Sequence, residues 1–220
     1  MATVAETQLD LYRQALLYCE EEPINAITNP ASTPGQAYLD VVWNNGAGVN
    51  ACLEEGEWTF ATRTVALSYN PAYTPPFGYR YAFNKPADYL RTAGISADPY
   101  FNQPLQLYSD ENTYWFCDLT AIYVRYISND SHFGMDLTKW PESFKQFVAA
   151  HFASKIIGKL THAQDKVQAM EKRRAQLLAS ARGKDGLNEE VKYFPAGSWS
   201  RARRGRGSGY RLSGRWDDAG

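Results

Sequence analysis

The chain has 220 residues, of which 44% are hydrophobic and 21% are charged, and this balance is that of a folded globular protein rather than a disordered one. No apolar run approaches the roughly 20 residues that a membrane-spanning helix needs, and residues 1–6 lack the basic and apolar regions of a signal peptide. We therefore expect neither an integral membrane protein nor a secreted one. Three widely spaced cysteines, an odd number, predict buried reduced thiols of a cytosolic compartment, with no disulfide framework and no zinc site: Cys19, Cys52 and Cys117.

The formal net charge of −1 is unevenly distributed along the chain. Residues 201–220 contain six arginines and two aspartates, a net charge of +4, and residues 1–200 therefore carry −5. An acidic body followed by a basic tail indicates that the tail has a role that the body does not share.

The first 57 residues predict two helices. The first follows a capping-box pattern at Thr7, has apolar residues at spacings of 3 and 4, and ends before Pro23 and the Asn29–Pro30 pair. The second begins after 32–34 and stops at Gly56, and two internal glycines weaken it by about 1 kcal/mol each relative to alanine. Its predicted buried face consists of Tyr38, Val41, Val42, Val49 and Leu53.

From Trp58 the period changes from 3.6 toward 2, which predicts a strand over residues 58–65. Residues 69–126 contain ten of the 15 tyrosines, Trp115 and six of the 11 prolines, which excludes long helices and favours short strands and loops. We expect a hairpin of residues 105–108 and 113–117 that turns through 109–112, and a strand at 121–127. The aromatic residues either fill the core of a β module or form an interface, and the residues alone leave both interpretations open.

Helix is predicted again from Pro141. A wide apolar stripe runs along this helix, on Phe144, Phe147, Val148, His151, Phe152, Ile156 and Leu160. Thr161 is expected to cap a further helix that ends at Gly183 and Gly186. The buried side of that helix would consist of Val167, Met170, Leu177 and Leu178. Its solvent-facing side would consist of Lys166, Lys172, Arg173 and Arg174.

This order predicts an α+β, mainly α fold, in which a helical bundle is interrupted by an inserted β-rich module and followed by an extended basic C-terminal tail. The boundaries are 1–57 and 131–187 for the bundle, 58–130 for the module and 188–220 for the tail. Trp58 and Ile122 should mark the two crossings between bundle and module. One helical core should contain Leu9, Tyr12, Leu16, Val41, Val42, Phe147, Val148, Phe152, Ile156 and Leu177.

Motifs of catalysis and of cofactor binding are not apparent in the sequence. The three histidines are scattered, and His151, on an apolar helix stripe, is more often a hydrogen-bonded core residue than a ligand. No HExxH, GxSxG or P-loop sequence occurs. The glutamates at 20–22 and at 54, 55 and 57 are more often solvated helix ends than cation sites, although 20–22 at a helix C-terminus favours a basic neighbour. We expect no enzyme, no cofactor and no metal.

The arginine-rich tail has three interpretations. It resembles an RGG-type segment, which binds nucleic acid through phosphate charge. It also suits a segment that becomes ordered on an acidic protein groove, anchored by its aromatic residues. Five large aromatic residues argue against a merely solubilising tail: Tyr193, Phe194, Trp199, Tyr210 and Trp216.

Four stretches resemble, in order, the tail tubular protein A family, the head-to-tail adaptors of short-tailed bacteriophages. Leu53–Ala61 resembles the end of that family's second helix, and Tyr81–Arg91 resembles its "Y…P-x-D-x-L-R" segment. Ile122–Ile127 is similar to its "I-x-x-R-Y-I" strand, and Trp140–Thr161 to its fourth motif, a helix. The resemblance spans about residues 7–182 and departs from the family in the proline-rich loop 70–78, at the glycines of the second helix and in the tail.

The resemblance implies a structural protein of the virion, assembled in the bacterial cytoplasm as a ring of twelve copies. Such a ring would lie between the portal protein and a tail nozzle or tail tube protein, and double-stranded DNA would pass through it, with no membrane involved. The competing hypothesis is a nucleic-acid-binding protein that acts through its tail. The residues expected to bind the portal are Tyr193, Phe194, Trp199, Arg201, Arg203, Arg204, Arg206, Tyr210, Arg211 and Trp216.

Overall fold

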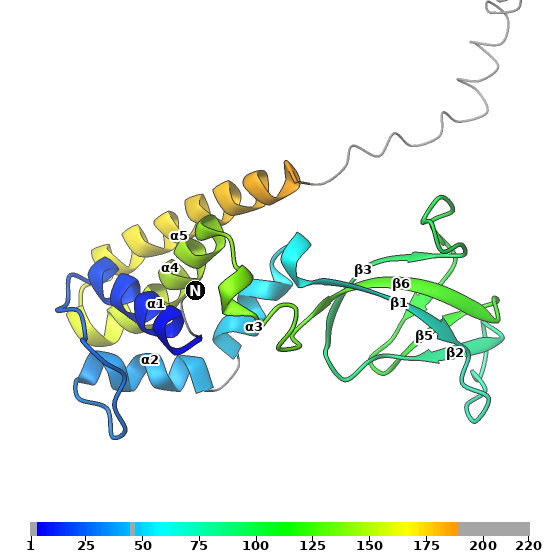
Figure 1. Ribbon diagram of the computed structural model, residues 1–220, viewed down its shortest axis with the longest axis horizontal. Coiled ribbons are helices and arrows are strands. Elements are labelled where there is room, and N and C mark those ends of the chain that lie inside the picture. Colours follow the sequence, from blue (N-terminus) through cyan, green and yellow to red (C-terminus); the bar gives the residue numbers. More distant parts are fainter. Residues whose placement is uncertain (1–3, 45–46, 189–220) are drawn as a thin grey trace, which may run out of the picture. The chain divides into compact units, whose positions relative to one another are not determined.

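The computed structural model describes residues 4–44 and 47–188, and this part of the chain is an α+β fold that is mainly α (Figure 1). Three helices precede the strands: α1 (Val4–Tyr18), α2 (Pro34–Asn44) and α3 (Ala47–Glu54). Two longer helices follow them, α4 (Glu142–Thr161) and α5 (Gln164–Gly186). The predicted class, α+β and mainly α, is confirmed.

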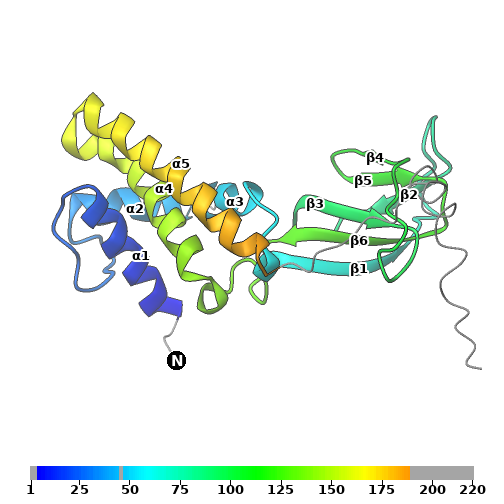
Figure 2. The same cartoon turned by 90° about the horizontal axis from the view of Figure 1, so that it is seen from above.

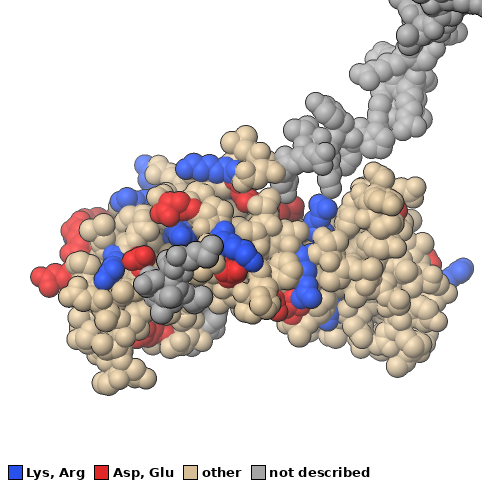
Figure 3. All heavy atoms as spheres, viewed as in Figure 1, with Lys and Arg blue, Asp and Glu red and all other residues tan. Residues whose placement is uncertain are grey.

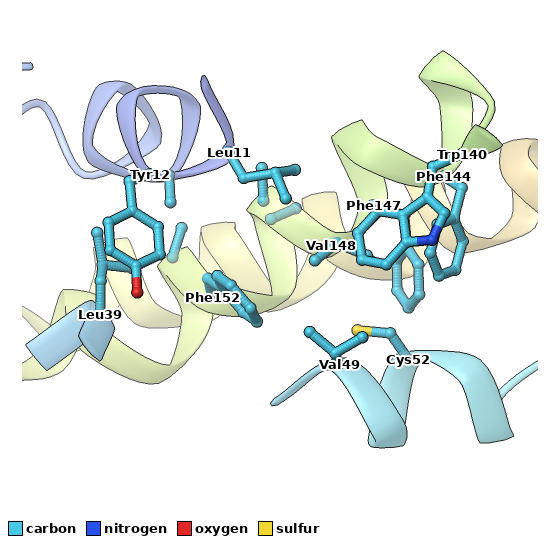
Figure 4. Close-up of a cluster of buried hydrophobic side chains, with 14 of the residues drawn as sticks. Leu11, Tyr12, Leu39, Val49, Cys52, Trp140, Phe144, Phe147, Val148 and Phe152 are labelled. Carbon is cyan, nitrogen blue, oxygen red and sulfur yellow. The ribbon is translucent and has the colours of Figure 1, made fainter. Parts of the chain in front are cut away.

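Helix α4 is the centre of the helical core, because α1, α2, α3 and α5 all pack against it. Its predicted apolar stripe is confirmed as buried from Phe144 to Ile156, while Leu160 is partly buried (Figure 4). Alanines at 149, 150 and 153 are also fully buried, so the helix is covered on most of its circumference. A helix that is apolar on nearly every side belongs in a protein interior.

The predicted buried face of the second helix is confirmed in part, since Val49 and Leu53 are buried and Val42 is partly buried, but α2 buries other residues at its start. Gly35, Gln36 and Leu39 are buried, whereas Tyr38 is 39% exposed and Val41 is 59% exposed. The reason is a close contact at Gly35, where an added Cβ would lie 2.7 Å from the Cδ2 atom of Leu16. The missing side chain lets α2 approach α1 on this face, and Val41 is thereby turned away from the core.

The predicted second helix is two helices, and the prediction of a single one is wrong. Gly48 lies in α3, where an added Cβ would be 2.8 Å from Phe152 Cε1 and equally close to Val42 Cγ1. The glycine that weakens a continuous helix therefore permits α3 to lie against α4.

Most of the predicted helical core is confirmed. Six of its members are buried and three are partly buried, and Val41 is the one that is wrong. The buried members are Tyr12, Leu16, Phe147, Val148, Phe152 and Ile156, and the partly buried ones are Leu9, Val42 and Leu177.

The strands form two antiparallel three-stranded sheets. The first has the order β1 (Thr62–Ser68), β6 (Ala121–Ser128), β3 (Tyr89–Ser96), and the second has the order β2 (Tyr81–Asn84), β5 (Tyr114–Cys117), β4 (Ser109–Asp110). Side chains of both sheets share one apolar cluster, formed by Phe83, Ile95, Trp115, Cys117, Ile122, Val124 and Tyr126.

The strand boundaries differ from the prediction at three places. Residues 59–61 form a 3-10 helix and the first strand begins at Thr62, because Trp58 turns into the helical core, 4.7 Å from the Phe144 ring. Residues 105–108 are not a strand, and β4 occupies 109–110 inside the predicted turn. Trp58 precedes the strands as predicted. Ile122 does not mark the second crossing, because it lies within β6 and in the buried cluster of the two sheets, and the chain leaves the first sheet only after Ser128.

The turn between α4 and α5 also differs from the prediction. Thr161 is the last residue of α4, and its hydroxyl donates to the Ile157 carbonyl instead of capping α5. His162 ends α4 with a left-handed φ of 53°. Helix α5 continues through Gly183 to Gly186 and, as predicted, packs Val167, Met170, Leu177 and Leu178 on the core.

Candidate protein-interaction surface

Two long aromatic loops leave the same end of the first sheet. In the pairing of β1 with β6, Ser68 is opposite Ala121, and in the pairing of β3 with β6, Ser96 is opposite Tyr123. The loops 69–80 and 97–108 therefore leave the first sheet at the same end, and they extend to opposite sides of the strands in Figures 1 and 2. Antiparallel pairing with β6 thus places the starts of both loops at one end of the first sheet.

The two loops expose large apolar side chains. Phe77 is 86% exposed, Tyr100 is 81% exposed and Leu107 is 78% exposed, and Tyr69 and Tyr73 are each more than one-third exposed. We call these five residues the loop-tip surface. These large exposed apolar side chains, at one end of the strand region, are the candidate contacts for another molecule.

Internal hydrogen bonds hold the loop 97–108 in its conformation. The Asp98 carboxylate accepts from the backbone N–H groups of Tyr100, Asn102 and Gln103 at 2.7–3.2 Å. The Ser96 hydroxyl donates to the Gln103 carbonyl at 3.0 Å and so closes the base of the loop. The exposed side chains are thus presented by an ordered backbone, which lowers the entropy cost of binding.

Aromatic stacking holds the loop 69–80 against the second sheet. The Tyr73 ring stacks on Tyr114 with centroids 4.5 Å apart and an interplanar angle of 13°, and the Tyr69 and Tyr81 centroids are 4.8 Å apart. The Asn70 side chain accepts from the Ala72 N–H group at 2.9 Å. With its tyrosines fixed in this way, the loop leaves Phe77 pointing to solvent.

The loop-tip surface has almost no charge. Residues 69–80 and 97–108 contain two ionisable side chains that are charged at pH 7, Arg80 and Asp98, and backbone amides already satisfy the Asp98 carboxylate. Figure 3 shows the charged side chains of one face gathered mainly over the helices, with few over the strands. Phosphate binding needs several cations, so this surface suits an apolar protein partner and not nucleic acid.

The aromatic residues of 69–126 are divided between the core of the strand region and its surface. Phe83, Trp115 and Tyr126 are fully buried in the shared cluster, whereas Phe77 and Tyr100 face solvent. The exposed ones were not singled out in the sequence. Their signal was the neighbouring prolines, since Phe77 follows two prolines and Tyr100 follows one, outside any alternating pattern.

Asp88 ties the loop before β3 to the other strands of its sheet. Its carboxylate accepts from Arg63 Nη1 of β1 at 2.9 Å, from the Tyr126 hydroxyl of β6 at 3.1 Å and from the Ser128 hydroxyl. Burial alone would raise the pKa of Asp88, but the hydrogen bonds from Ser128 and Arg63 outweigh it and hold the pKa below its ordinary value. In the same network, burial and the Asp88 charge raise the pKa of Tyr126 to about 12.

Ion pairs and hydrogen bonds connect residues 54–59, at and after the end of α3, to β3 and to α5. Arg91 Nη2 lies 3.2 Å from Glu57 Oε1, and Arg91 Nη1 donates to the Glu54 carbonyl at 3.1 Å. Glu55 accepts from Arg174, and Thr59 donates from its N–H and hydroxyl groups to Asp185 at 2.9 and 2.8 Å. The carboxylates of Glu55 and Glu57, with the backbone carbonyl of Glu54, therefore connect this segment to its neighbours.

His151 is a buried core residue, as predicted. Its Nδ1 accepts from Arg174 Nε at 2.9 Å, while its buried Nε2 has no partner among the residues described. Burial, with the charges of Arg174 and Lys155, lowers the pKa of His151 to about 4. Arg174 was expected to face water, and that expectation is wrong, because Glu55 and His151 draw its guanidinium inward.

Glu20 and the three cysteines, which the sequence also singled out, have structural places in the fold. Glu20 pairs with Lys166 Nζ at 2.6 Å, in agreement with a basic neighbour for the 20–22 run. All three cysteines are buried and free, and burial raises the pKa of Cys19 to about 11. Within 4–44 and 47–188, no group of three His, Cys, Asp or Glu side chains is arranged to hold a metal ion.

The ten residues predicted to bind a portal, Tyr193 to Trp216, all lie outside the described residues, so the structure does not test them. The described helices include none that is long and apolar enough to cross a membrane. No protein-family model matches the chain, and no curated protein matches it.

Proposed function

We propose that this protein is a structural head-to-tail adaptor of a short-tailed bacteriophage, which forms a ring between portal and tail and catalyses no reaction. The observation that carries the proposal is the loop-tip surface. Its aromatic groups stand on ordered loops and carry little charge, as in the centre of a protein–protein interface. The resemblance of four stretches to the tail tubular protein A family supplies the particular class.

The contacts among the resembling stretches support this class. Trp58 and Phe60, from the first stretch, pack against Phe144, from the last, with ring centroids 4.7 and 4.8 Å apart. Asp88, from the second stretch, accepts from Tyr126, from the third. Trp58 and Phe60 thus join the segment before β1 to α4, and Asp88 joins two parts of the strand region. We expect such contacts if the architecture is a helical bundle with an inserted β module.

The charge distribution suits a DNA path. Each body carries −5 over residues 1–200, and an acidic ring would repel phosphate and let the duplex slide without adhering. The arginines at 201–211 are then best used against acidic grooves of the portal, where each guanidinium can make paired hydrogen bonds to a carboxylate. The loop-tip surface would then bind the next protein of the tail, a tail nozzle or tail tube protein.

Negative-stain imaging and mass photometry with and without the cognate portal protein test the proposal. We expect twelvefold rings on the portal. The double variant Phe77→Ser/Tyr100→Ser should keep these rings but lose the attachment of the tail protein, while Val41→Ser, a matched change on exposed α2, should lose neither. Absence of any complex with the portal would refute the adaptor function.

The second candidate, a nucleic-acid-binding protein, rests on the six arginines of residues 201–220. It requires an affinity for duplex DNA that falls steeply with salt and disappears when residues 196–220 are removed. A salt titration of DNA binding by the full chain and by this deletion distinguishes the two functions.

A further inference from the structure

The outer side of strand β1 has no partner strand within the described part of the chain. This strand lies at one side of the first sheet, next to β6 (Figure 2). Just beyond it, the N–H group of Tyr69 donates to the Thr120 carbonyl at 3.2 Å, which makes these two residues a hydrogen-bonded pair. Such pairs alternate along an antiparallel ladder, so the backbone groups of 63, 65 and 67 face β6 and those of 62, 64, 66 and 68 face outward.

The outward backbone groups of β1 are open to another strand. Within 4–44 and 47–188, the N–H and C=O groups of Thr64, Ala66 and Ser68 make no backbone hydrogen bond outside the pairing with β6. All three residues are exposed. An edge of this kind is a template on which a further strand can pair.

The other edge strands of the two sheets are protected. The pairing of β3 with β6 is irregular at two places, and the outer side of β3 is bridged at Ser96 by Pro104. Strand β2 has four residues and β4 has two, and the Ala82 carbonyl of β2 accepts from Asn70. Bulges, short strands and covering loops are devices that prevent pairing between edges. Strand β1, with seven residues, no proline and a regular register, lacks them.

The sequence of β1 is complementary to itself in one antiparallel register. With a two-fold axis at Val65, residue 64 lies opposite 66 of a second copy, and residue 62 lies opposite 68. All four have outward backbone groups, so every pair can exchange both of its hydrogen bonds. The one charged side chain of β1, Arg63, lies opposite Leu67 and not opposite itself, and Asp88 already pairs with it.

The part of the chain that carries this edge has no net charge. Residues 62–128 contain five basic and five acidic side chains, whereas residues 1–200 as a whole carry −5. Two copies can therefore approach through their strands without the repulsion that their remaining, acidic parts would cause. We propose that a second copy of this chain pairs with β1 across a two-fold axis, so that the two first sheets become one continuous antiparallel sheet.

This pairing does not depend on the adaptor function. In a ring with cyclic symmetry the contacts between copies are head-to-tail, so a two-fold contact belongs to the free chain before assembly. Absence of the dimer would leave the adaptor proposal standing, because that proposal is tested by rings on the portal.

Sedimentation velocity of the full chain over a range of concentrations tests the pairing. We expect an equilibrium between monomer and dimer. The Ala66→Pro variant removes an outward N–H group that takes no part in the β6 ladder, and proline is tolerated at such edge positions. Its far-UV circular dichroism spectrum should therefore match that of the unmodified chain, while its dimer should be lost.

Two double variants at exposed positions test the register. In Thr64→Glu/Ala66→Lys, opposite charges meet across the two-fold axis, whereas in Thr64→Lys/Ala66→Lys, like charges meet. Because the axis creates this cross-strand contact twice, the dimer of the first variant should have a dissociation constant about tenfold lower than that of the second. Ala121→Lys, an exposed change on β6, is the control and should leave the dimer of the unmodified chain as it is.

Three results would overturn the proposal. The first is a full chain that stays monomeric at every concentration or assembles only into larger species. The second is a dimer that persists in the folded Ala66→Pro variant. The third is an equal dissociation constant for the two double variants, since the strands would then not meet in this register.

Discussion

Replacing Asp88 by asparagine tests whether the carboxylate that joins β1 to β6 stabilises the fold. The side chain is 16% exposed and accepts from Arg63, Tyr126 and Ser128. Asparagine has a nearly identical shape but removes the charge and turns an NH₂ group toward at least one of these donors. Since hydrogen bonds to a charged group contribute about 1.5–3 kcal/mol, and the Arg63 pair is discounted for its exposure, we expect a loss of about 2–3 kcal/mol at pH 7.

The pH dependence of this loss identifies its cause. The folded-state pKa of Asp88 lies below its ordinary value of 3.8, so its contribution is fully present above that value and is lost as the pH falls through the folded pKa. Urea denaturation followed by circular dichroism, at pH 7 and at stepwise lower pH, should therefore show the stability gap between the unmodified chain and the Asp88→Asn variant closing in acid.

Glu111→Gln, the same chemical change at an exposed carboxylate, is the control and should change stability by less than about 0.5 kcal/mol. A gap at Asp88 below about 0.5 kcal/mol at pH 7, or one that is independent of pH, would refute the reasoning.

Further tests address the glycines, the buried histidine and the tail. Gly48→Ala should destabilise the protein by about 1–3 kcal/mol, because the added methyl group meets Phe152 and Val42. Gly183→Ala, with open space around it on α5, should instead stabilise the protein by up to about 1 kcal/mol. Thermal unfolding measures both changes, and equal effects of the two variants would contradict the packing argument. The folded-state pKa of His151, near 4, lies below the unfolded value of 6.5, so the free energy of unfolding should fall by about 3 kcal/mol as the pH falls from 6.5 to 4. Urea denaturation of the His151→Gln variant should lack this part of the acid dependence. An identical pH profile for the variant and the unmodified chain would show that His151 does not cause it. Truncation at Ala196 should leave the circular dichroism spectrum of the body unchanged and abolish stable portal attachment in a pull-down, and unchanged attachment would show that the body alone binds.

Periodicity in the sequence was sufficient to predict which faces of the long elements are buried. The stripe from Phe144 to Ile156 and the strand at 121–128 are apolar on the faces that they bury, so burial could be predicted without knowing the partner. The portal-binding residues were predicted from composition alone, and they remain a prediction because they lie outside the described residues.

The sequence by itself determined the mainly α class, the order of helices and strands, and most of the core, because local apolar spacing carries that information. The tertiary structure decided which face of α2 is buried, since that depends on Gly35 meeting Leu16 from another helix. It also decided that Arg174 turns inward to His151 and Glu55, and that Phe77, Tyr100 and Leu107 are exposed on the loops at one end of the strand region. These features arise from contacts between residues distant in the chain, and such contacts leave no periodic signal in any single segment.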